Sequence, residues 1–318
     1  MATKIQNKGE IIEMKSTRQA FGETLFEVMK KDKRVFSLTA DLAESLKILK
    51  VKESFPERFI DTGVAEANMA GVAAGLAIAG YIPVAGTFAV FMTRAFDHIR
   101  LQICQNNLHV ILVGSHGGVS NAADGGSAHA LEDFAFLRAL PNMTIINPTD
   151  YNETRQAFLA AIDYPGPVYL RLYREPTAQI TESAEKFIIG KARIIRKGKD
   201  ITVVASGPQT AEALVVADRM SDKIDVEVIS VPTIKPLDKK TILKSAKKTG
   251  RVITVEDHSI NGGLGSAVAE ILAENKVGKL LRLGLRQFGE SGEYSALIKK
   301  VGIDSGAIIK AIRQLIKG

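Results

Sequence analysis

The chain has 318 residues, of which 46% are hydrophobic and 24% charged, so it can bury more than one core and we expect two α/β domains. No apolar run reaches the length that crosses a bilayer, and residues 1–16 carry charge without the apolar core of a signal peptide. We therefore expect a cytoplasmic protein that does not bind membranes. The net charge of +7 comes without arginine-rich tracts, zinc-ligand spacing or aromatic-interleaved basic strands, which favours anionic small molecules over nucleic acid.

The first half of the chain alternates helical and strand patterns. Residues 17–29 repeat apolar side chains at helical spacing, and residues 34–41 follow as a strand. Further strand-like runs fall at residues 59–63, 82–88, 109–116, 143–149 and 167–173. Alternation of this kind predicts a parallel sheet with helices on both faces, here as a domain over residues 13–176.

A polar stretch at residues 175–187 interrupts this alternation and is typical of a linker. A second α/β pattern follows, closed by an amphipathic helix at residues 306–318, and predicts a smaller domain over residues 190–318. Its strand-like runs are residues 201–207, 224–231, 251–257 and 280–285. The single cysteine, Cys104, falls in a predicted helix and is interpreted as a small buried residue without a catalytic role.

Ligands of open α/β sheets bind beyond the carboxyl ends of the strands, so the residues that follow each strand are candidates for a site. The second domain offers only Gly207, Asp257 with His258, and Gln287 at such places. The first domain is much richer, and we expect the chemistry there. Its candidates are Asp41, Ser45, Glu66, Phe88, Phe91, His116, Asp124, His129 and Arg174.

Several candidates have two possible interpretations. Glu66 opens a helix rich in alanine and glycine, where a carboxylate either complements the helix dipole or contacts a heterocycle nitrogen. Phe88 and Phe91, three residues apart, are either core or a stacking platform for an aromatic ring. The run at 262–265, GGLG, resembles a weak phosphate cradle at a helix start.

The glycine-rich loop at 115–133 has no packing reason to be as polar as it is. It carries His116, Asp124 and His129, and their spacing matches no compact metal-ligand motif. The arginines near the predicted site are either surface charges or ligands of an anion. They are Arg18, Arg171 and Arg174.

Taken together, these segments resemble the transketolase family. The similar blocks, in the family's order, are residues 61–77, 84–91, 115–129, 137–157, 167–175 and 255–270, and the resemblance extends over about residues 13–317. It implies a parallel-sheet domain that binds the pyrimidine of thiamine diphosphate, followed by a smaller α/β C-terminal domain. The implied activity is transfer of a two-carbon ketol unit from a ketose phosphate to an aldose phosphate, as in the pentose phosphate pathway.

The resemblance also implies roles for the cofactor-binding candidates. Glu66 matches the catalytic carboxylate that shares a proton with N1′ of the aminopyrimidine, which lets the exocyclic nitrogen remove the thiazolium C2 proton. Phe88 and Phe91 match aromatic residues of the pyrimidine pocket. A further family aromatic is replaced here by Arg94. Asp41 aligns with a family aspartate near the cofactor.

For the substrate, the resemblance implies a phosphate site with guanidinium, hydroxyl and imidazole donors. Its matching residues are Arg18, Ser45, His116 and Arg174. Asp124 and His129 match residues that bind sugar hydroxyls, and both histidines match catalytic positions. The family's loop reads GED-G-x-T-H, whereas this loop has lost the glutamate and has one extra residue between Asp124 and His129. We therefore predict a shifted place for His129.

The sequence contains no GDG motif, with which thiamine-diphosphate enzymes hold Mg²⁺ and the diphosphate. In whole transketolases that motif lies in an N-terminal domain. We therefore expect a separately encoded N-terminal partner subunit that supplies the metal ligands, so that this chain holds no metal by itself. Self-association of this chain into a dimer would then give a heterotetramer.

Three alternatives remain open at this point. The β chain of a 2-oxo acid dehydrogenase would have the same two domains and glutamate, but would decarboxylate its substrate and feed a lipoyl carrier. A deoxyxylulose-phosphate synthase is less favoured because that family usually keeps its domains in one chain. A non-catalytic scaffold would have no reason to retain Glu66 with Phe88, His116 and Asp124.

Overall fold

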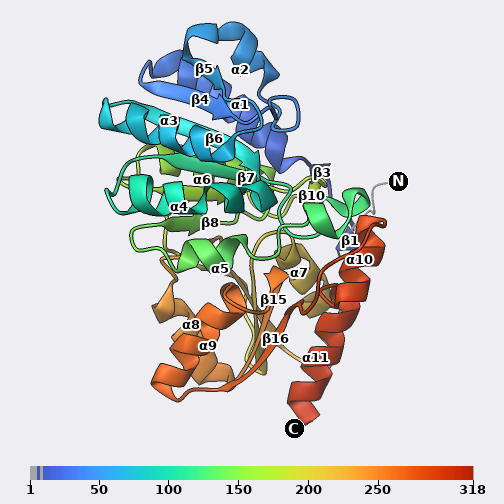
Figure 1. Ribbon diagram of the computed structural model, residues 1–318. Helices are drawn as coiled ribbons and strands as arrows, with labels where there is room; N and C mark the ends of the chain where they lie inside the picture. Colours follow the sequence, from blue (N-terminus) through green and yellow to red (C-terminus); the bar gives the residue numbers. More distant parts are fainter. Residues whose placement is uncertain (1–5, 8–9, 318) are drawn as a thin grey trace.

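The computed structural model describes residues 6–7 and 10–317, as two α/β domains that lie one above the other (Figure 1). Residues 1–5, 8–9 and 318 lie outside the described part, and with them part of the predicted charged start and the last residue of the predicted second domain. The predicted fold class, a parallel-sheet domain followed by a smaller α/β domain, is confirmed.

The first domain is built on a seven-stranded sheet with the order β14-β8-β9-β7-β6-β4-β5. All of its neighbouring strands are parallel except β14, which pairs antiparallel with β8 and comes from the second half of the chain. The strands are β4 (Val35–Thr39), β5 (Phe59–Asp61), β6 (Ile82–Phe88), β7 (Ile111–Ser115), β8 (Thr144–Ile146), β9 (Val168–Arg171) and β14 (Thr233–Lys235).

Helices cover both faces of this sheet, as the alternating pattern predicts (Figure 1). One face carries α1 (Thr17–Lys31), α2 (Leu49–Ser54) and α6 (Tyr151–Ile162). The other carries α3 (Glu66–Ile78), η2 (Ala89–Ala95), α4 (Phe96–His98), η3 (Ile99–Cys104) and α5 (Asp133–Arg138). Two of these helices begin with a side-chain cap. Before α1, Ser16 accepts from the backbone N–H of Gln19, and before α6, Asp150 accepts from the backbone N–H of Glu153.

The second domain has a five-stranded sheet with the order β11-β13-β12-β15-β16, in which only the edge strand β11 is antiparallel. The strands are β11 (Arg193–Arg196), β12 (Ile201–Ala205), β13 (Val226–Ser230), β15 (Arg251–Ser259) and β16 (Lys279–Leu285). Its helices are α7 (Gln209–Arg219), α8 (Lys239–Thr249), α9 (Leu264–Asn275), α10 (Tyr294–Val301) and the closing helix α11 (Ser305–Lys317).

The two domains share their hydrophobic interior. One apolar cluster joins α3 and α5 of the first domain to α8 and α9 of the second. A second cluster takes side chains of the glycine-rich loop into the core of the second domain, namely Val119, Ala122 and Leu131. The predicted linker is fixed to the first domain by main-chain pairing, because β10 (Thr177–Ala178) is antiparallel to β3 (Met14–Lys15). The glycine-rich loop is therefore held from both domains, which the sequence pattern did not predict.

Among the described residues, no helix has both the length and the apolar character that crossing a membrane requires.

Candidate functional site

Glu66 begins α3 and is almost completely buried, with 4% of its side chain exposed. The N-cap of this helix is Ala65, and the helix start has no side-chain capping bond. Within the described residues, the polar partner of the Glu66 carboxylate is Arg94, whose Nη1 lies 3.4 Å from Oε1. A buried carboxylate that accepts from an exposed arginine, and not from its own helix start, is available to a ligand that replaces the arginine.

Phe88 and Phe91 form a stack at the carboxyl end of β6. Their ring centroids are 5.4 Å apart with an interplanar angle of 13°, and Phe88 also stacks on His116 at 3.8 Å. Both phenylalanines are partly exposed and belong to none of the described apolar clusters. The arrangement therefore favours the stacking-platform interpretation over the core interpretation.

His116 follows β7 in a left-handed backbone conformation, with φ 58°, and its Nδ1 lies 2.9 Å from the hydroxyl of Ser115. Burial, and to a smaller extent the positive charges of Arg18, Arg174 and Lys47, lower the pKa of His116 to about 3. The imidazole is consequently neutral at physiological pH and can accept or donate one hydrogen bond. The same three cations make this end of the sheet attractive to an anion.

Arg18 ties together the loops that carry the predicted phosphate ligands. Its guanidinium donates to the carbonyls of Ser45 and Arg174, both at 2.9 Å, while its Nε is buried without a partner. Burial and the charge of Arg174 lower the pKa of Arg18. Arg174 in turn donates to Asn121 Oδ1 at 2.7 Å and forms an ion pair with Asp124 at 3.3 Å. The structure thus brings Arg18, Ser45, Asp124 and Arg174 into one network.

His129 lies near Asp124 of this network, but neither of its ring nitrogens has a hydrogen-bond partner there among the described residues. Its side chain is 2% exposed and packs beneath Gly289 of the second domain, where an added Cβ would come within 2.2 Å of Nδ1. Burial lowers the pKa of His129, opposed by the nearby Ala122 carbonyl and Asp124, although neither ring nitrogen has a well-formed hydrogen bond. Its assignment as a sugar ligand stays a prediction.

Arg171 is not a surface charge, which was one of its two interpretations. It is completely buried where the domains meet and forms an ion pair with Asp133 at 3.0 Å. It also donates to the carbonyls of Asp257 and Ala130, at 2.8 and 2.7 Å. Tyr169 donates to Asp133 at 2.7 Å. Arg171 therefore belongs to the junction of the domains and not to the site.

Asp257, one of the strand-end residues of the second domain, holds the glycine-rich loop. Its Oδ1 accepts from the backbone N–H of Val119 at 3.0 Å, and a Cβ on Gly118 would collide with its carboxylate. Burial raises the pKa of Asp257 to about 6, against the lowering effect of Arg171. The candidate residues lie in the first domain, as expected. The second domain nevertheless helps to position them, because Asp257 holds the glycine-rich loop of the first domain.

The phosphate-cradle interpretation of residues 262–265 is wrong. The backbone N–H groups of Leu264 and Gly265 at the start of α9 both donate to the carboxylate of Glu256, each at 2.7 Å. The side chain of Glu256 is buried, and burial raises its pKa to about 7 while these two N–H groups lower it. A carboxyl group of the chain itself thus fills the place that a phosphate would take.

The contacts described for two other candidates do not include the residues named above. Cys104 is buried in η3, and burial raises the pKa of its thiol to about 11, in keeping with a packing role. Asp41 is exposed, with φ 59°, and its N–H donates to Asp61. A direct role of Asp41 at the cofactor stays a prediction.

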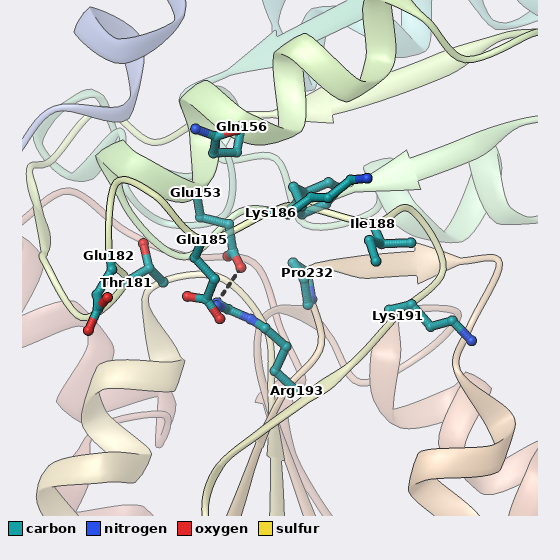
Figure 2. Close-up of a pocket in the computed structure, with 11 residues that line it drawn as sticks. Glu153, Gln156, Thr181, Glu182, Glu185, Lys186, Ile188, Lys191, Arg193 and Pro232 are labelled. Carbon is teal, nitrogen blue, oxygen red and sulfur yellow. Dashed lines mark hydrogen bonds and ion pairs between the residues drawn. The ribbon is translucent and has the colours of Figure 1, made fainter.

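A separate cavity of about 110 Å³ lies beneath the linker (Figure 2). Arg193 crosses it between the buried Glu153, at 2.6 Å, and Glu185. Burial raises the pKa of Glu153, opposed by the charge of Arg193. Glu153 and Glu185 both pair with Arg193, so these three charged groups are not free to bind a ligand in the cavity.

Sequence reasoning missed Lys47 and Asn121. Lys47 lies two residues after Ser45 in the segment that follows β4, and Asn121 lies in the polar loop. Both stretches contain predicted site residues. Loop conformation, however, decides which of their side chains come near His116 or Arg174. Lys47 itself has φ 63°, a backbone conformation that side-chain spacing does not predict.

Comparison with protein families assigns both halves of the chain. A family described as "Transketolase, pyrimidine binding domain" matches residues 13–179, and one described as "Transketolase, C-terminal domain" matches residues 190–308. With the sheet topology, these matches define a two-domain α/β protein of the kind that binds the pyrimidine of thiamine diphosphate. The chain belongs to the transketolase family, which implies dependence on that cofactor.

Individual relatives agree with this assignment. A protein of Methanocaldococcus jannaschii described as a transketolase C-terminal section is 42% identical, over 95% of this chain and 97% of that protein. A 6-deoxy-6-sulfo-D-fructose transketolase subunit of a Clostridium species is 40% identical over 94% of each chain. The transketolase of Mus musculus is 39% identical over 95% of this chain but only 49% of its own length.

A solved structure has the same fold. A split-gene transketolase, described as an inactive β4 tetramer, superposes with a TM-score of 0.88 at 38% identity, over 95% of this chain and 99% of that chain. The similarity therefore extends through both domains.

The residues of this chain fit one end of thiamine diphosphate. The partly exposed rings of Phe88 and Phe91 and the buried carboxylate of Glu66 suit a flat, nitrogen-containing ring. The other end of the cofactor is a diphosphate bound to a metal ion. Within residues 6–7 and 10–317, no three His, Cys, Asp or Glu side chains lie close enough together to hold such an ion.

Proposed function

We propose that this chain is the C-terminal subunit of a two-chain transketolase, which transfers a two-carbon ketol unit from a ketose phosphate to an aldose phosphate. The observation that carries the proposal is the stacking of Phe88 on His116, while Arg18 and Arg174, which are joined by a hydrogen bond, and Lys47 act electrostatically on that imidazole. Cations around an imidazole suit a phosphorylated sugar, and the stacked ring suits a heterocyclic cofactor beside it.

Each residue of the site has a proposed task. Phe88 and Phe91 bind the pyrimidine ring, and Glu66 holds a proton at its ring nitrogen. Thiamine diphosphate, when bound, would supply a carbon nucleophile and, in its thiazolium ring, an electron sink. The neutral His116 orients the sugar by a hydrogen bond, and Asp124 receives the acceptor hydroxyls.

A partner subunit completes the proposal. Two relatives that this chain matches over nearly their whole length are described as a C-terminal section and as a split-gene protein. We infer that an N-terminal subunit with a GDG motif supplies the Mg²⁺ ligands, and that two copies of each chain assemble. The cytoplasmic location, like the pentose phosphate pathway, stays a prediction.

The test is reconstitution with the GDG-containing chain of the same organism. Calorimetry should show no micromolar, Mg²⁺-dependent binding of thiamine diphosphate to this chain alone, and such binding to the mixture. The mixture should then transfer ketol units between sugar phosphates. Lipoamide reduction would instead identify a 2-oxo acid dehydrogenase, consumption of pyruvate with glyceraldehyde phosphate a deoxyxylulose-phosphate synthase, and binding without any turnover a scaffold.

A further inference from the structure

Arg94 touches both of the groups that are proposed to bind the pyrimidine. Its Nη1 lies 3.4 Å from Glu66 Oε1, and its guanidinium carbon lies 4.8 Å from the centroid of the Phe91 ring. Arg94 lies on η2, immediately after the strand that ends in Phe88. A single side chain therefore closes the gap between the carboxylate and the aromatic stack.

The guanidinium resembles the ligand in shape and hydrogen bonding. It is planar, donates N–H to a carboxylate and stacks on an aromatic face. An aminopyrimidine ring has the same needs, because it stacks on a ring and shares a proton with a carboxylate. A pyrimidine that bonded to Glu66 and stacked on Phe91 would need the contacts that Arg94 now holds.

Arg94 can leave these contacts easily. Its side chain is 56% exposed, whereas that of Glu66 is 4% exposed. Among the described residues, the ion pair with Glu66 and the contact with Phe91 are its side-chain interactions. A half-exposed ion pair and a solvent-exposed cation–π contact are each weak, so together they should reduce ligand affinity by roughly 3- to 30-fold.

We propose that Arg94 is a positioning residue that occupies the pyrimidine contacts in the free chain. It keeps the buried Glu66 carboxylate paired until the cofactor displaces it. This inference rests on the proposed function, since it assumes that Glu66 and Phe91 receive the pyrimidine. It also explains why an arginine can stand where the family has an aromatic residue, because a guanidinium covers Phe91 as a ring would.

The test compares ligand affinity, not activity. Thiamine, which has no diphosphate and needs no metal, is titrated into this chain alone and followed by NMR. Arg94→Gln should bind it roughly 3- to 30-fold more tightly than the wild type. Arg94→Tyr should gain at least as much by supplying a wall for the ring, and Arg94→Lys should gain less because it keeps the charge without the planar fork.

Arg100→Gln is the matched control, since Arg100 is an exposed arginine on the neighbouring η3. It should leave thiamine affinity unchanged. Thermal unfolding of each variant checks the fold, and if Arg94→Gln does not fold, Arg94→Tyr and Arg94→Lys carry the same comparison. Equal affinity of the wild type and the Arg94 variants would overturn the proposal. Lower affinity in the variants would also overturn it, because Arg94 would then be a ligand of the cofactor.

The reconstituted pair separates this inference from the proposed function. Its affinity for thiamine diphosphate with Mg²⁺ should rise in Arg94→Gln by the same factor as the affinity of the chain alone for thiamine. If the reconstituted enzymes with the wild-type chain and with the Arg94 variants bound the cofactor equally well, only the Arg94 proposal would fail. If no pair bound it, the proposed function would fail and the Arg94 proposal with it.

Discussion

The site and the junction between the domains use the same residue types in opposite surroundings. Arg171 and Arg174 are three residues apart, yet the side chain of Arg171 is 0% exposed and that of Arg174 is 37% exposed. Arg171 is surrounded by Asp133 and two backbone carbonyls. Arg174 pairs with Asp124 and Asn121 beyond the carboxyl end of β9.

This difference teaches that charge alone does not mark a functional site. A buried arginine held by an ion pair and two backbone carbonyls joins two pieces of the fold, and an incoming ligand cannot reach it. A half-exposed arginine that has an exposed partner, here Asp124, can exchange that partner for a phosphate. Six variants can break or sharpen this comparison.

The largest effect should come from Glu66→Gln. Glutamine keeps the size and one hydrogen bond but cannot hold and release a proton, so ketol transfer by the reconstituted enzyme should fall by about 10²- to 10⁴-fold. Steady-state rates measure the loss, and size-exclusion chromatography should show unchanged assembly. Turnover within a few-fold of the wild type would reduce Glu66 to a residue that complements the helix dipole.

Arg171→Met should mainly affect stability. It leaves Asp133 buried without its ion-pair partner, which should cost about 3–5 kcal/mol in the free energy of unfolding, measured with urea. Arg174→Met is the matched control, three residues away, and should weaken substrate binding while the unfolding midpoint stays close to that of the wild type. Equal destabilisation by the two variants would remove the distinction between junction and site.

The junction should also make stability depend on pH through Glu256. Burial raises its pKa from 4.5 to about 7, so the folded chain keeps a proton that the unfolded chain releases. This contribution is complete below pH 4.5 and is lost as the pH rises toward 7, by up to about 3 kcal/mol. Glu256→Gln cannot titrate, so its stability relative to the wild type should rise over this window.

Urea unfolding at several pH values from 4.5 to 7.5 measures that difference. His258 contributes in the opposite sense, because burial lowers its pKa to about 4 and its contribution is lost as the pH falls from 6.5 toward that value. Both proteins contain His258, whose Nδ1 lies 3.9 Å from Glu256 Oε2, so the comparison measures the titration of Glu256 together with its coupling to His258. Parallel profiles for the two proteins would show that Glu256 is ionised in the folded chain throughout.

The smallest effects should come from the glycine-rich loop, where Asp124 and His129 should differ. Asp124→Ala should lower full ketol transfer by about tenfold, the worth of a hydrogen bond to a charged group, and affect the donor half-reaction less. His129→Ala should instead lower the free energy of unfolding, because its ring is buried beneath Gly289.

Stopped-flow measurement of the donor half-reaction, beside full transfer, separates the two roles. If Asp124→Ala harmed both reactions equally, the acceptor assignment would have to be withdrawn. If His129→Ala lost full transfer at unchanged stability, His129 would be a sugar ligand despite its burial.

Much of the fold could be predicted from local patterns. Helical spacing at residues 17–29 corresponds to α1, and the strand-like runs correspond to strands of the two sheets, because side-chain periodicity reflects which face of an element is buried. The polar strand ends around Glu66 and His116 were recognisable for the same reason. The strand β14 was not, since a three-residue strand followed by proline has no period to detect.

The sequence by itself determined which side chains stand at the carboxyl ends of the strands, because strand order along the chain and residue type are both local. The tertiary structure alone decided which of them meet. Burial of Arg171, pairing of Arg94 with Glu66, and coverage of His129 by Gly289 each join segments at least 28 residues apart in the chain or in different domains. Such contacts depend on how whole elements pack, and no local pattern contains that information.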